Sequence, residues 1–277
     1  MFNRVVIVGV GLLGGSLGLA LKQRGLASKV IGVGRSDGAL EKALKLNAID
    51  RGETSFGDAC VEAELVVVCT PVQTISDYLR QALAAAPADA ILTDVGSTKA
   101  AICGELDVLG AGQFCGSHPL AGSEKGGVEF ADGDLFRGRQ VVLTPGESTG
   151  ENVVRKLSRM WEAVGAKRVM MTAGEHDAAL ARTSHLPHLL ASALAASTDT
   201  SLLPLAASGW CDTTRIAAGG IDLWRQILLE NRKPVLDALQ DLSNHLDQWK
   251  TALEMASEEQ LTELLQSGKQ QRDSVAN

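Results

Sequence analysis

A glycine motif near the N-terminus constrains this chain more than any other feature of its sequence. A β-branched run ends at residue 8, the motif GxGxxG follows, and a helical pattern begins at residue 12. Such a motif leaves free backbone N–H groups at the positive end of a helix, where a pyrophosphate binds. A second strand-like run at 29–33 completes the strand–helix–strand spacing of a dinucleotide-binding unit. The residues predicted to form this site are Gly9, Gly11, Leu12, Leu13 and Gly14.

Short β-branched runs alternate with helical stretches from residue 4 to about residue 171. The expected strands are 4–8, 29–33, 64–70, 90–95, 114–117, 140–144 and 167–171. The expected helices between them are 12–24, 38–46, 72–85, 98–108 and 150–163. This alternation is typical of a parallel sheet wrapped by helices. The fold class predicted for residues 1–172 is therefore an α/β domain with a Rossmann-type, doubly wound sheet.

The remainder of the chain, residues 173–277, reads as Ala- and Leu-rich helix. One long helical stretch is expected over 176–201, and its segment 186–196 is apolar on more than one face. A helix of that kind is central to its domain or is buried against a second subunit. We therefore expect an all-α C-terminal domain that forms a homodimer.

Composition excludes several classes of partner and compartment. The net charge of −7 gives no reason to expect nucleic acid as a partner, and no run of 18 apolar residues is present to span a membrane. The five cysteines are odd in number and form no CxxC pair. That pattern favours a reduced, cytoplasmic compartment.

The end of the second strand bears on which dinucleotide binds. A site for NAD usually has an acidic residue there for the ribose 2′-hydroxyl, whereas this chain has Gly34 followed by Arg35 and Ser36. A guanidinium and a hydroxyl suit a 2′-phosphate, so NADP is favoured. The alternative is that Asp37 binds the ribose and that the cofactor is NAD. Thr70 and Pro71 stand where the strand at 64–70 ends and the loop begins. A cofactor normally passes this point, so we add both residues to the predicted site.

Polar clusters follow two further strands, DVGSTK at 94–99 and SHPLAGSE at 117–124. Because ligands of doubly wound folds bind at the carboxyl ends of the strands, both clusters should face the nicotinamide. Two more clusters lie in the helical region, SHLPH at 184–188 and DTTRIA at 212–217.

Together with the glycine motif, these four clusters resemble the prephenate/arogenate (cyclohexadienyl) dehydrogenase family of tyrosine biosynthesis. The resemblance runs over nearly the whole chain and implies oxidative decarboxylation of a cyclohexadienol. Hydride leaves ring C4 for the nicotinamide, the 4-hydroxyl loses its proton, and the C1 carboxylate departs as the ring becomes aromatic. The roles implied by the resemblance are catalysis for His118 and Ser97, and substrate binding for His188, Arg215 and Ser123.

The residue types suit those roles. Imidazole titrates near neutral pH, so His118 can accept the hydroxyl proton, and Ser97 would hydrogen-bond the same hydroxyl or the histidine. The planar guanidinium of Arg215 matches a substrate carboxylate. Aromatisation drives the reaction, so no metal is expected, and His185 and His188 have no third ligand at a suitable spacing. By the family match His185 points into the helical packing, while His176 and His245 are expected to be solvated.

Three functional alternatives stay open. Relatives that favour arogenate with NADP can have an apolar residue at the position of His188, so its presence favours prephenate, or both substrates, over an arogenate-specific enzyme. Another two-domain NADP reductase, such as a β-hydroxyacid dehydrogenase or a pyrroline carboxylate reductase, is the second alternative, but the GxxxKxxxN pattern of the hydroxyacid enzymes is missing near 165–200. The third is a non-catalytic NADP-binding sensor, which would have no need of His118, Ser97 and Arg215 together.

Overall fold

The structure is a computed structural model that describes residues 1–122 and 126–275. Ser123, one of the residues predicted to bind substrate, lies outside the described residues. The chain divides into two compact units, Met1–Asn231 and Arg232–Asn277, which are described separately.

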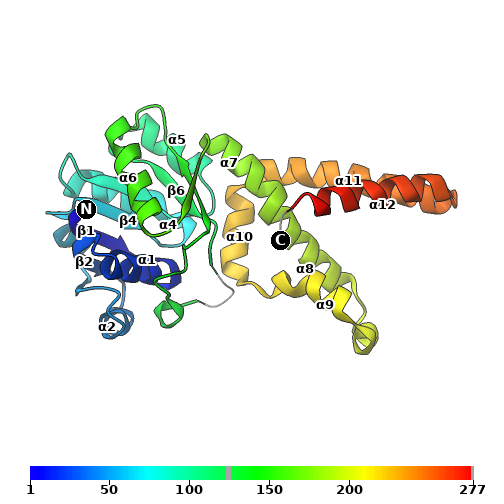
Figure 1. Ribbon diagram of the computed structural model, residues 1–277, viewed down its shortest axis with the longest axis horizontal. Coiled ribbons are helices and arrows are strands. Elements are labelled where there is room, and N and C mark those ends of the chain that lie inside the picture. The colour runs from blue at the N-terminus through cyan, green and yellow to red at the C-terminus, as the bar shows by residue number, and fades with distance from the viewer. Residues whose placement is uncertain (123–125, 276–277) are drawn as a thin grey trace. The chain divides into compact units, whose positions relative to one another are not determined.

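The first unit is built on a five-stranded parallel sheet in the order β3-β2-β1-β4-β5. Figure 1 labels three of these strands, β1, β2 and β4. Its strands are β1 (Phe2–Val8), β2 (Ala27–Val33), β3 (Arg51–Glu53), β4 (Leu65–Val68) and β5 (Ile91–Asp94). From β1 the chain moves outward through β2 and β3, then crosses to the other side of β1 to form β4 and β5. Ligands of doubly wound sheets bind where the direction reverses, here between the carboxyl ends of β1 and β4.

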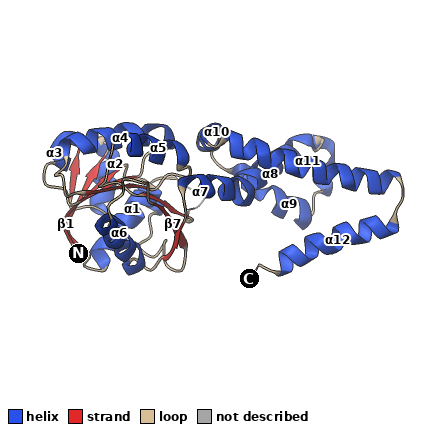
Figure 2. Ribbon diagram, turned by 90° about the horizontal axis from the view of Figure 1, so that it is seen from above, coloured by secondary structure: helices blue, strands red, loops and turns tan. Residues whose placement is uncertain are grey.

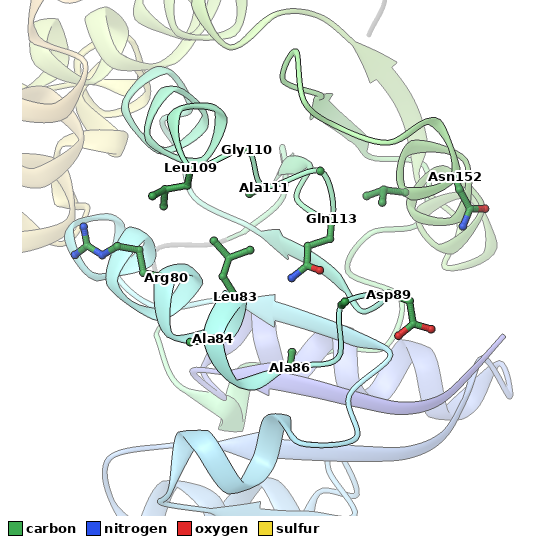
Figure 3. A pocket seen from close by; sticks show the side chains of 13 residues that line it. Arg80, Leu83, Ala84, Ala86, Asp89, Leu109, Gly110, Ala111, Gln113 and Asn152 are labelled. Atoms are coloured by element: carbon green, nitrogen blue, oxygen red, sulfur yellow. The ribbon is translucent and has the colours of Figure 1, made fainter.

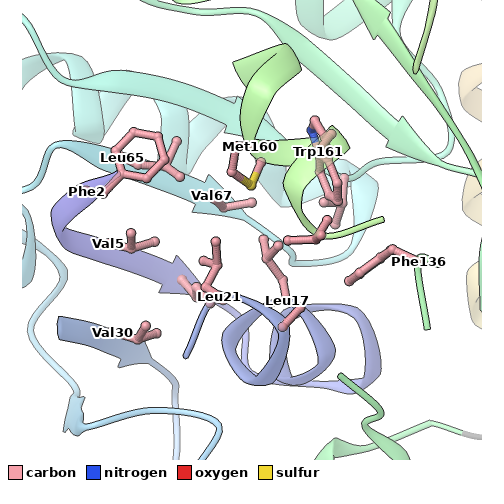
Figure 4. Packing of buried hydrophobic residues seen from close by; sticks show 14 of the residues in the cluster. Phe2, Val5, Leu17, Leu21, Val30, Leu65, Val67, Phe136, Met160 and Trp161 are labelled. Carbon is pink, nitrogen blue, oxygen red and sulfur yellow. The ribbon is translucent and has the colours of Figure 1, made fainter. Parts of the chain in front are cut away.

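Helices cover both faces of this sheet, as Figure 2 shows. They are α1 (Leu12–Gln23), α2 (Asp37–Lys45), α3 (Phe56–Cys60), α4 (Val72–Ala85), α5 (Ala100–Val108) and α6 (Glu151–Ala163). Alternate residues of β1 point to opposite faces: Val5 packs with α1 and α6, and Val6 packs with α3, α4 and α5. Figure 4 shows the first of these clusters, with Leu17 of α1 and Trp161 of α6 against the strands. Burial on both faces is why the strands read as continuous apolar runs.

The expectation that the strands after β5 continue one parallel sheet is wrong. A second sheet has the order β6-β7-β8, from β6 (Gly116–Pro119), β7 (Gln140–Thr144) and β8 (Lys167–Met170), and β6 runs antiparallel to β7. Parallel neighbours need a long crossover, usually a helix. The described part of the connection from β6 to β7 contains only a 3₁₀ turn, Val128–Phe130, so β7 returns antiparallel. The two sheets meet where Phe114 pairs with Leu92 of β5.

Two short elements escaped the sequence prediction, because β3 contains no β-branched residue and α3 is only slightly longer than one turn. The other expected elements are present, with boundaries that differ by a few residues. The fold class, a Rossmann-type sheet followed by helices, is confirmed.

The helical part of the first unit begins at Ala173, about one turn before residue 176, where the long helical stretch was expected to begin. Its elements are α7 (Ala173–Leu180), a π-helical turn (Ala181–His185), α8 (Leu186–Ser197), a 3₁₀ helix (Thr200–Leu205), α9 (Ser208–Thr214), a second 3₁₀ helix (Arg215–Ala218) and α10 (Ile221–Glu230). Thr172 and Glu175 form a capping box that starts α7. Pro187 has no N–H for the regular ladder, and the helix widens into the π turn just before it.

The first compact unit extends past residue 172, because α7 packs against α5 and β7. A domain boundary at 172–173 therefore stays a prediction. The second unit consists of α11 (Arg232–Glu254) and α12 (Glu258–Asp273), with Ser257 capping the latter. In the part of the chain that is described, no helix is both long and apolar enough to cross a bilayer.

Candidate active site

A cavity of about 400 Å³ lies at the carboxyl ends of β1, β2 and β4. It brings together six of the residues predicted to bind the dinucleotide: Gly9, Gly11, Arg35, Ser36, Thr70 and Pro71. The other three belong to the start of α1, where Leu12 and Leu13 are half-buried and Gly14 is buried. Six of the nine predicted residues thus line one cavity at the switch point of the sheet, and the other three begin the helix that follows Gly11.

Two glycines of the motif are required by the backbone itself. Gly9 has φ +90°, and a Cβ on it would lie 2.8 Å from the carbonyl oxygen of Cys69. A Cβ on Gly14 would lie 2.2 Å from the carbonyl oxygen of Gly9, so α1 could not pack as closely on β1. A Cβ on Gly11 would meet nothing within 4 Å. Open space therefore borders the backbone at Gly11, where a pyrophosphate would approach.

The far end of the cavity is aromatic and carries no negative charge. Thr54, Phe56 and Tyr78 line it beside Arg35 and Ser36, and Phe56 contacts Tyr78 with 5.4 Å between ring centroids. No Asp or Glu is among the described residues that line it, and Asp37 does not reach it. Neither aromatic ring was predicted from the sequence: Phe56 begins α3, and Tyr78 lies in α4.

His118 lies inside β6, opposite Val142 of β7, and not in the loop after a strand ending at 117 as predicted. Its ring is almost fully buried, and its Nδ1 lies 2.8 Å from Nε2 of His176 in α7. Burial lowers the pKa of His118 well below the usual imidazole value, and the nearby His176, Lys99 and His185 lower it further. The ring is therefore neutral at physiological pH and able to accept a proton.

His176 is fully buried, which contradicts the expectation that it is solvated. Its Nδ1 donates to Asp177 Oδ1 at 2.7 Å. Asp177 also accepts the backbone N–H groups of Lys99 and Ala100, both at 2.8 Å. Hydrogen bonds and the partner His176 hold the pKa of Asp177 below its ordinary value against the opposing effect of burial. The one sequence hint of burial was the i, i+4 spacing of His176 and Leu180, which puts the histidine on the same helix face as a buried leucine.

Lys99 and Asp94 form a fully buried ion pair that shapes the loop between β5 and α5. Asp94 also accepts the backbone N–H groups of Gly96 and Ser117, which ties this loop to β6. Ser97 stands on the loop, half-buried. Among the described residues its hydroxyl makes no hydrogen bond to His118, so the alternative role, a bond to the substrate hydroxyl, stays a prediction.

The helical side of the site centres on Trp224 of α10. His188 stacks on its indole with ring centroids 3.6 Å apart and planes 10° apart, and the His188 Nδ1 is buried without a hydrogen-bond partner. Burial lowers the pKa of His188. His185 lies in the helical packing, where its Nδ1 is 2.9 Å from the Asn231 side-chain nitrogen, and burial lowers its pKa to about 4. The same amide donates to the carbonyl oxygen of Asp177.

Arg215 is exposed at the start of the 3₁₀ helix Arg215–Ala218, which packs against α8. No ion pair to its guanidinium is present within residues 1–122 and 126–275. The end of this 3₁₀ helix touches the stacked pair, since a Cβ on Gly219 would lie 2.6 Å from Trp224 Nε1 and 3.1 Å from His188 Cε1. Trp224 and Asn231 are site residues that the sequence patterns did not reveal.

A larger groove, of about 880 Å³, lies at the other end of the strands (Figure 3). Arg80 and Leu83 of α4 line it together with Asp89 and Gln113, which precede β5 and β6. None of the described residues that line it is a histidine or a serine, and Ser97 follows β5 at the opposite, carboxyl end of the strands. The larger volume of this groove is therefore no reason to assign the reaction to it.

Comparison with known proteins identifies the family of the chain. Residues 17–170 match the model of the prephenate dehydrogenase nucleotide-binding domain, and residues 172–267 match that of the prephenate dehydrogenase dimerization domain. The chain belongs to the prephenate dehydrogenase family. It is 36% identical to a prephenate dehydrogenase of Bacillus subtilis over 99% of this chain and 76% of that protein. It is 32% identical to a cyclohexadienyl dehydrogenase of Zymomonas mobilis over 91% of this chain and 89% of that protein.

Solved structures of the family have the same fold. A prephenate dehydrogenase from Aquifex aeolicus, in complex with hydroxyphenyl propionate and NAD+, superposes with a TM-score of 0.93 at 32% identity over 100% of this chain and 99% of that one. A Synechocystis arogenate dehydrogenase gives 0.86 at 33% identity over 98% and 99% of the two chains. The chain is thus an NAD(P)-dependent dehydrogenase of this family.

Proposed function

We propose that this protein oxidatively decarboxylates prephenate to 4-hydroxyphenylpyruvate, accepts arogenate as a second substrate, and prefers NADP. The observation that carries the proposal is the buried His118, hydrogen-bonded to His176, in the same compact unit as the switch-point cavity and the polar cluster around His188.

His118 holds the substrate 4-hydroxyl and accepts its proton as hydride leaves C4. A neutral imidazole can do both, since one ring nitrogen has a free lone pair. Loss of the C1 carboxylate as carbon dioxide leaves a phenolate oxygen, and the same proton returns to it. Ser97, held in place by the Lys99–Asp94 pair, donates to the 4-hydroxyl and aligns it with His118.

The switch-point cavity fits a nicotinamide dinucleotide, because the backbone at Gly11 borders open space and aromatic rings line the far end. When bound, the oxidised nicotinamide supplies the hydride acceptor. Arg35 and Ser36 bind the 2′-phosphate of the adenosine ribose, and the absence of a carboxylate among the described lining residues supports NADP over NAD.

Substrate choice depends on His188 and Arg215. Arg215, without an ion-pair partner in the described structure, binds a substrate carboxylate. The unpartnered Nδ1 of His188 contacts the substrate side chain. When it carries the proton it donates to the keto oxygen of prephenate, and when it does not, its lone pair accepts from the ammonium of arogenate. The ability of a neutral ring to do either supports acceptance of both substrates. Ser123 is proposed as a further hydrogen-bonding partner from the sequence alone.

A steady-state assay of the four pairs of prephenate or arogenate with NADP or NAD tests the proposal. We expect the highest kcat/KM with prephenate and NADP, measured by the absorbance of the reduced nicotinamide. Absence of turnover with all four pairs would remove the proposal. His188→Ala should raise the KM for prephenate, and unchanged kinetics in this variant would remove the assigned role of His188.

A homodimer is the proposed assembly. The match to a dimerization-domain model over residues 172–267 supports it, as do exposed apolar side chains in each unit, including Leu205 and Ile221 in the first and Leu246 and Leu253 in the second. Light scattering after size exclusion should give twice the 29.1 kDa chain mass. A monomer at micromolar concentration would contradict this assembly.

A further inference from the structure

A continuous line of hydrogen bonds joins the start of α5 to His118. The backbone N–H groups of Lys99 and Ala100 donate to Asp177, the ring of His176 donates to Asp177, and the two rings share the bond between His176 Nε2 and His118 Nδ1. Asp177 and both histidines are buried. The sequence brings the two rings together from positions 58 residues apart.

The carboxylate sets the direction of these bonds. An ionised Asp177 can only accept, so the His176 Nδ1 must carry a proton. If His176 is neutral, its Nε2 then has only a lone pair, and the proton between the rings belongs to His118 Nδ1. His118 has no second proton when neutral, so its Nε2 has a free lone pair.

The opposite placement is costly. A proton on His176 Nε2 would make that ring an imidazolium with no solvent exposure, and burying a charge costs more than burying a neutral hydrogen-bonded ring. The Asp177 carboxylate already accepts two backbone N–H groups, so its negative charge is partly compensated without an imidazolium.

We propose that His176 and Asp177 are positioning residues that hold His118 as its Nδ1–H tautomer, which leaves Nε2 as the proton acceptor of the reaction. The inference rests on the proposed function only for the identity of the proton that Nε2 accepts. Asp177 has a second effect, because it caps α5 at the end of the loop that carries Ser97. One carboxylate thereby fixes both the acceptor nitrogen and the segment that aligns the substrate hydroxyl.

The tautomer can be measured directly, without substrate. The chain has five histidines, so the intact protein labelled with ¹⁵N-histidine gives few ring signals, and His118→Asn identifies those of His118 by their loss. At neutral pH we expect the His118 Nδ1 to resonate as a protonated, pyrrole-type nitrogen and its Nε2 as an unprotonated, pyridine-type nitrogen. A protonated Nε2 in the wild-type protein overturns the proposal whatever the variants do.

Two substitutions of His176 separate positioning from packing. His176→Gln keeps an acceptor for the His118 N–H, whereas His176→Leu has a similar volume and no acceptor. We expect kcat to fall about 100-fold in the leucine variant with little change in KM, and within about 10-fold of wild type in the glutamine variant, because a misplaced tautomer lowers the chemical step. The leucine variant should also show a mixed His118 tautomer. Equal kcat losses in both variants with the wild-type tautomer retained would reduce His176 to a packing residue.

The two measurements keep this inference distinct from the proposed function. An Nδ1–H tautomer that His176→Leu disturbs, in a protein inactive on all four substrate and cofactor pairs, supports the inference and refutes the function. Turnover with an Nε2–H tautomer does the reverse. If the leucine variant does not fold, the wild-type spectrum and the glutamine variant still decide.

Discussion

The cofactor end and the proton-accepting end of this site are built by different means. The glycine side of the switch-point cavity depends on backbone geometry, because Gly9 and Gly11 line it and Gly14 packs α1 closely behind it. The surroundings of His118 are made of side chains from β6, α7 and the loop before α5, joined by hydrogen bonds between buried groups. A pyrophosphate at the cavity would be bound by backbone N–H groups that any sequence with the right turn supplies, whereas the surroundings of His118 depend on the identity of each residue.

Because of this difference, substitutions at the two ends should impair different properties of the enzyme. A change in the backbone cradle alters packing between α1 and β1, so it should lower stability or cofactor affinity. A change at His118 removes the proposed proton acceptor, so it should lower kcat and leave cofactor affinity unchanged.

The largest expected effect is at the proton acceptor. His118→Asn retains a donor near the position of Nδ1 for His176 but has no Nε2, and kcat should fall by about 10³-fold, within the range for loss of a general base. Steady-state kinetics with prephenate and NADP give this value. Calorimetric titration of the variant with NADP should give the wild-type Kd, and a parallel loss of NADP affinity would break the separation of the two ends.

The next effect separates two glycines of the same motif. Gly14→Ala places a Cβ against the Gly9 carbonyl and should lower the free energy of unfolding by about 1–3 kcal/mol, the usual cost of overpacking. Gly11→Ala is the matched control, since its Cβ meets no protein atom within 4 Å. Urea unfolding should show that Gly11→Ala is as stable as wild type. Calorimetric titration should show that its Kd for the dinucleotide is raised. A Gly14→Ala variant as stable as wild type would contradict the close packing of α1 on β1.

A smaller effect distinguishes the cofactors. Arg35→Ala removes the cation at the end of β2, and kcat/KM for NADP should fall about 10-fold, equivalent to about 1.4 kcal/mol, as expected for one charge-assisted hydrogen bond. The value for NAD should stay unchanged and serves as the internal control. Equal losses with both cofactors would mean that Arg35 does not contact a 2′-phosphate.

The sequence predicted the cofactor end far better than the proton-accepting end, for a physical reason. Gly9, Gly11 and Gly14 act through local geometry, so their spacing alone indicates what they do. His176 was expected to be solvated because nothing near it in sequence reveals its contact with His118 in a different sheet. Trp224 and Asn231 were missed for the same reason, since an ordinary helix residue becomes part of a site only when α10 packs on α8. The antiparallel β6–β7 pair was likewise invisible to a pattern that records only alternating strands and helices.

The smallest expected effect concerns the pH dependence of stability, which the cofactor end should not contribute to. Burial lowers the pKa of His185 from 6.5 to about 4, so the unfolded chain binds more protons than the folded one as the pH falls below 6.5. The folded state therefore loses stability with acidification in that range, and His185 should contribute about 0.7 kcal/mol between pH 7 and pH 6. His185→Asn keeps an acceptor for the Asn231 amide and cannot titrate. Unfolding by urea at several pH values should give a shallower slope for this variant, whatever its stability at pH 7. The slope of Gly11→Ala should match wild type, and an identical slope in His185→Asn would mean that His185 is not held neutral by burial.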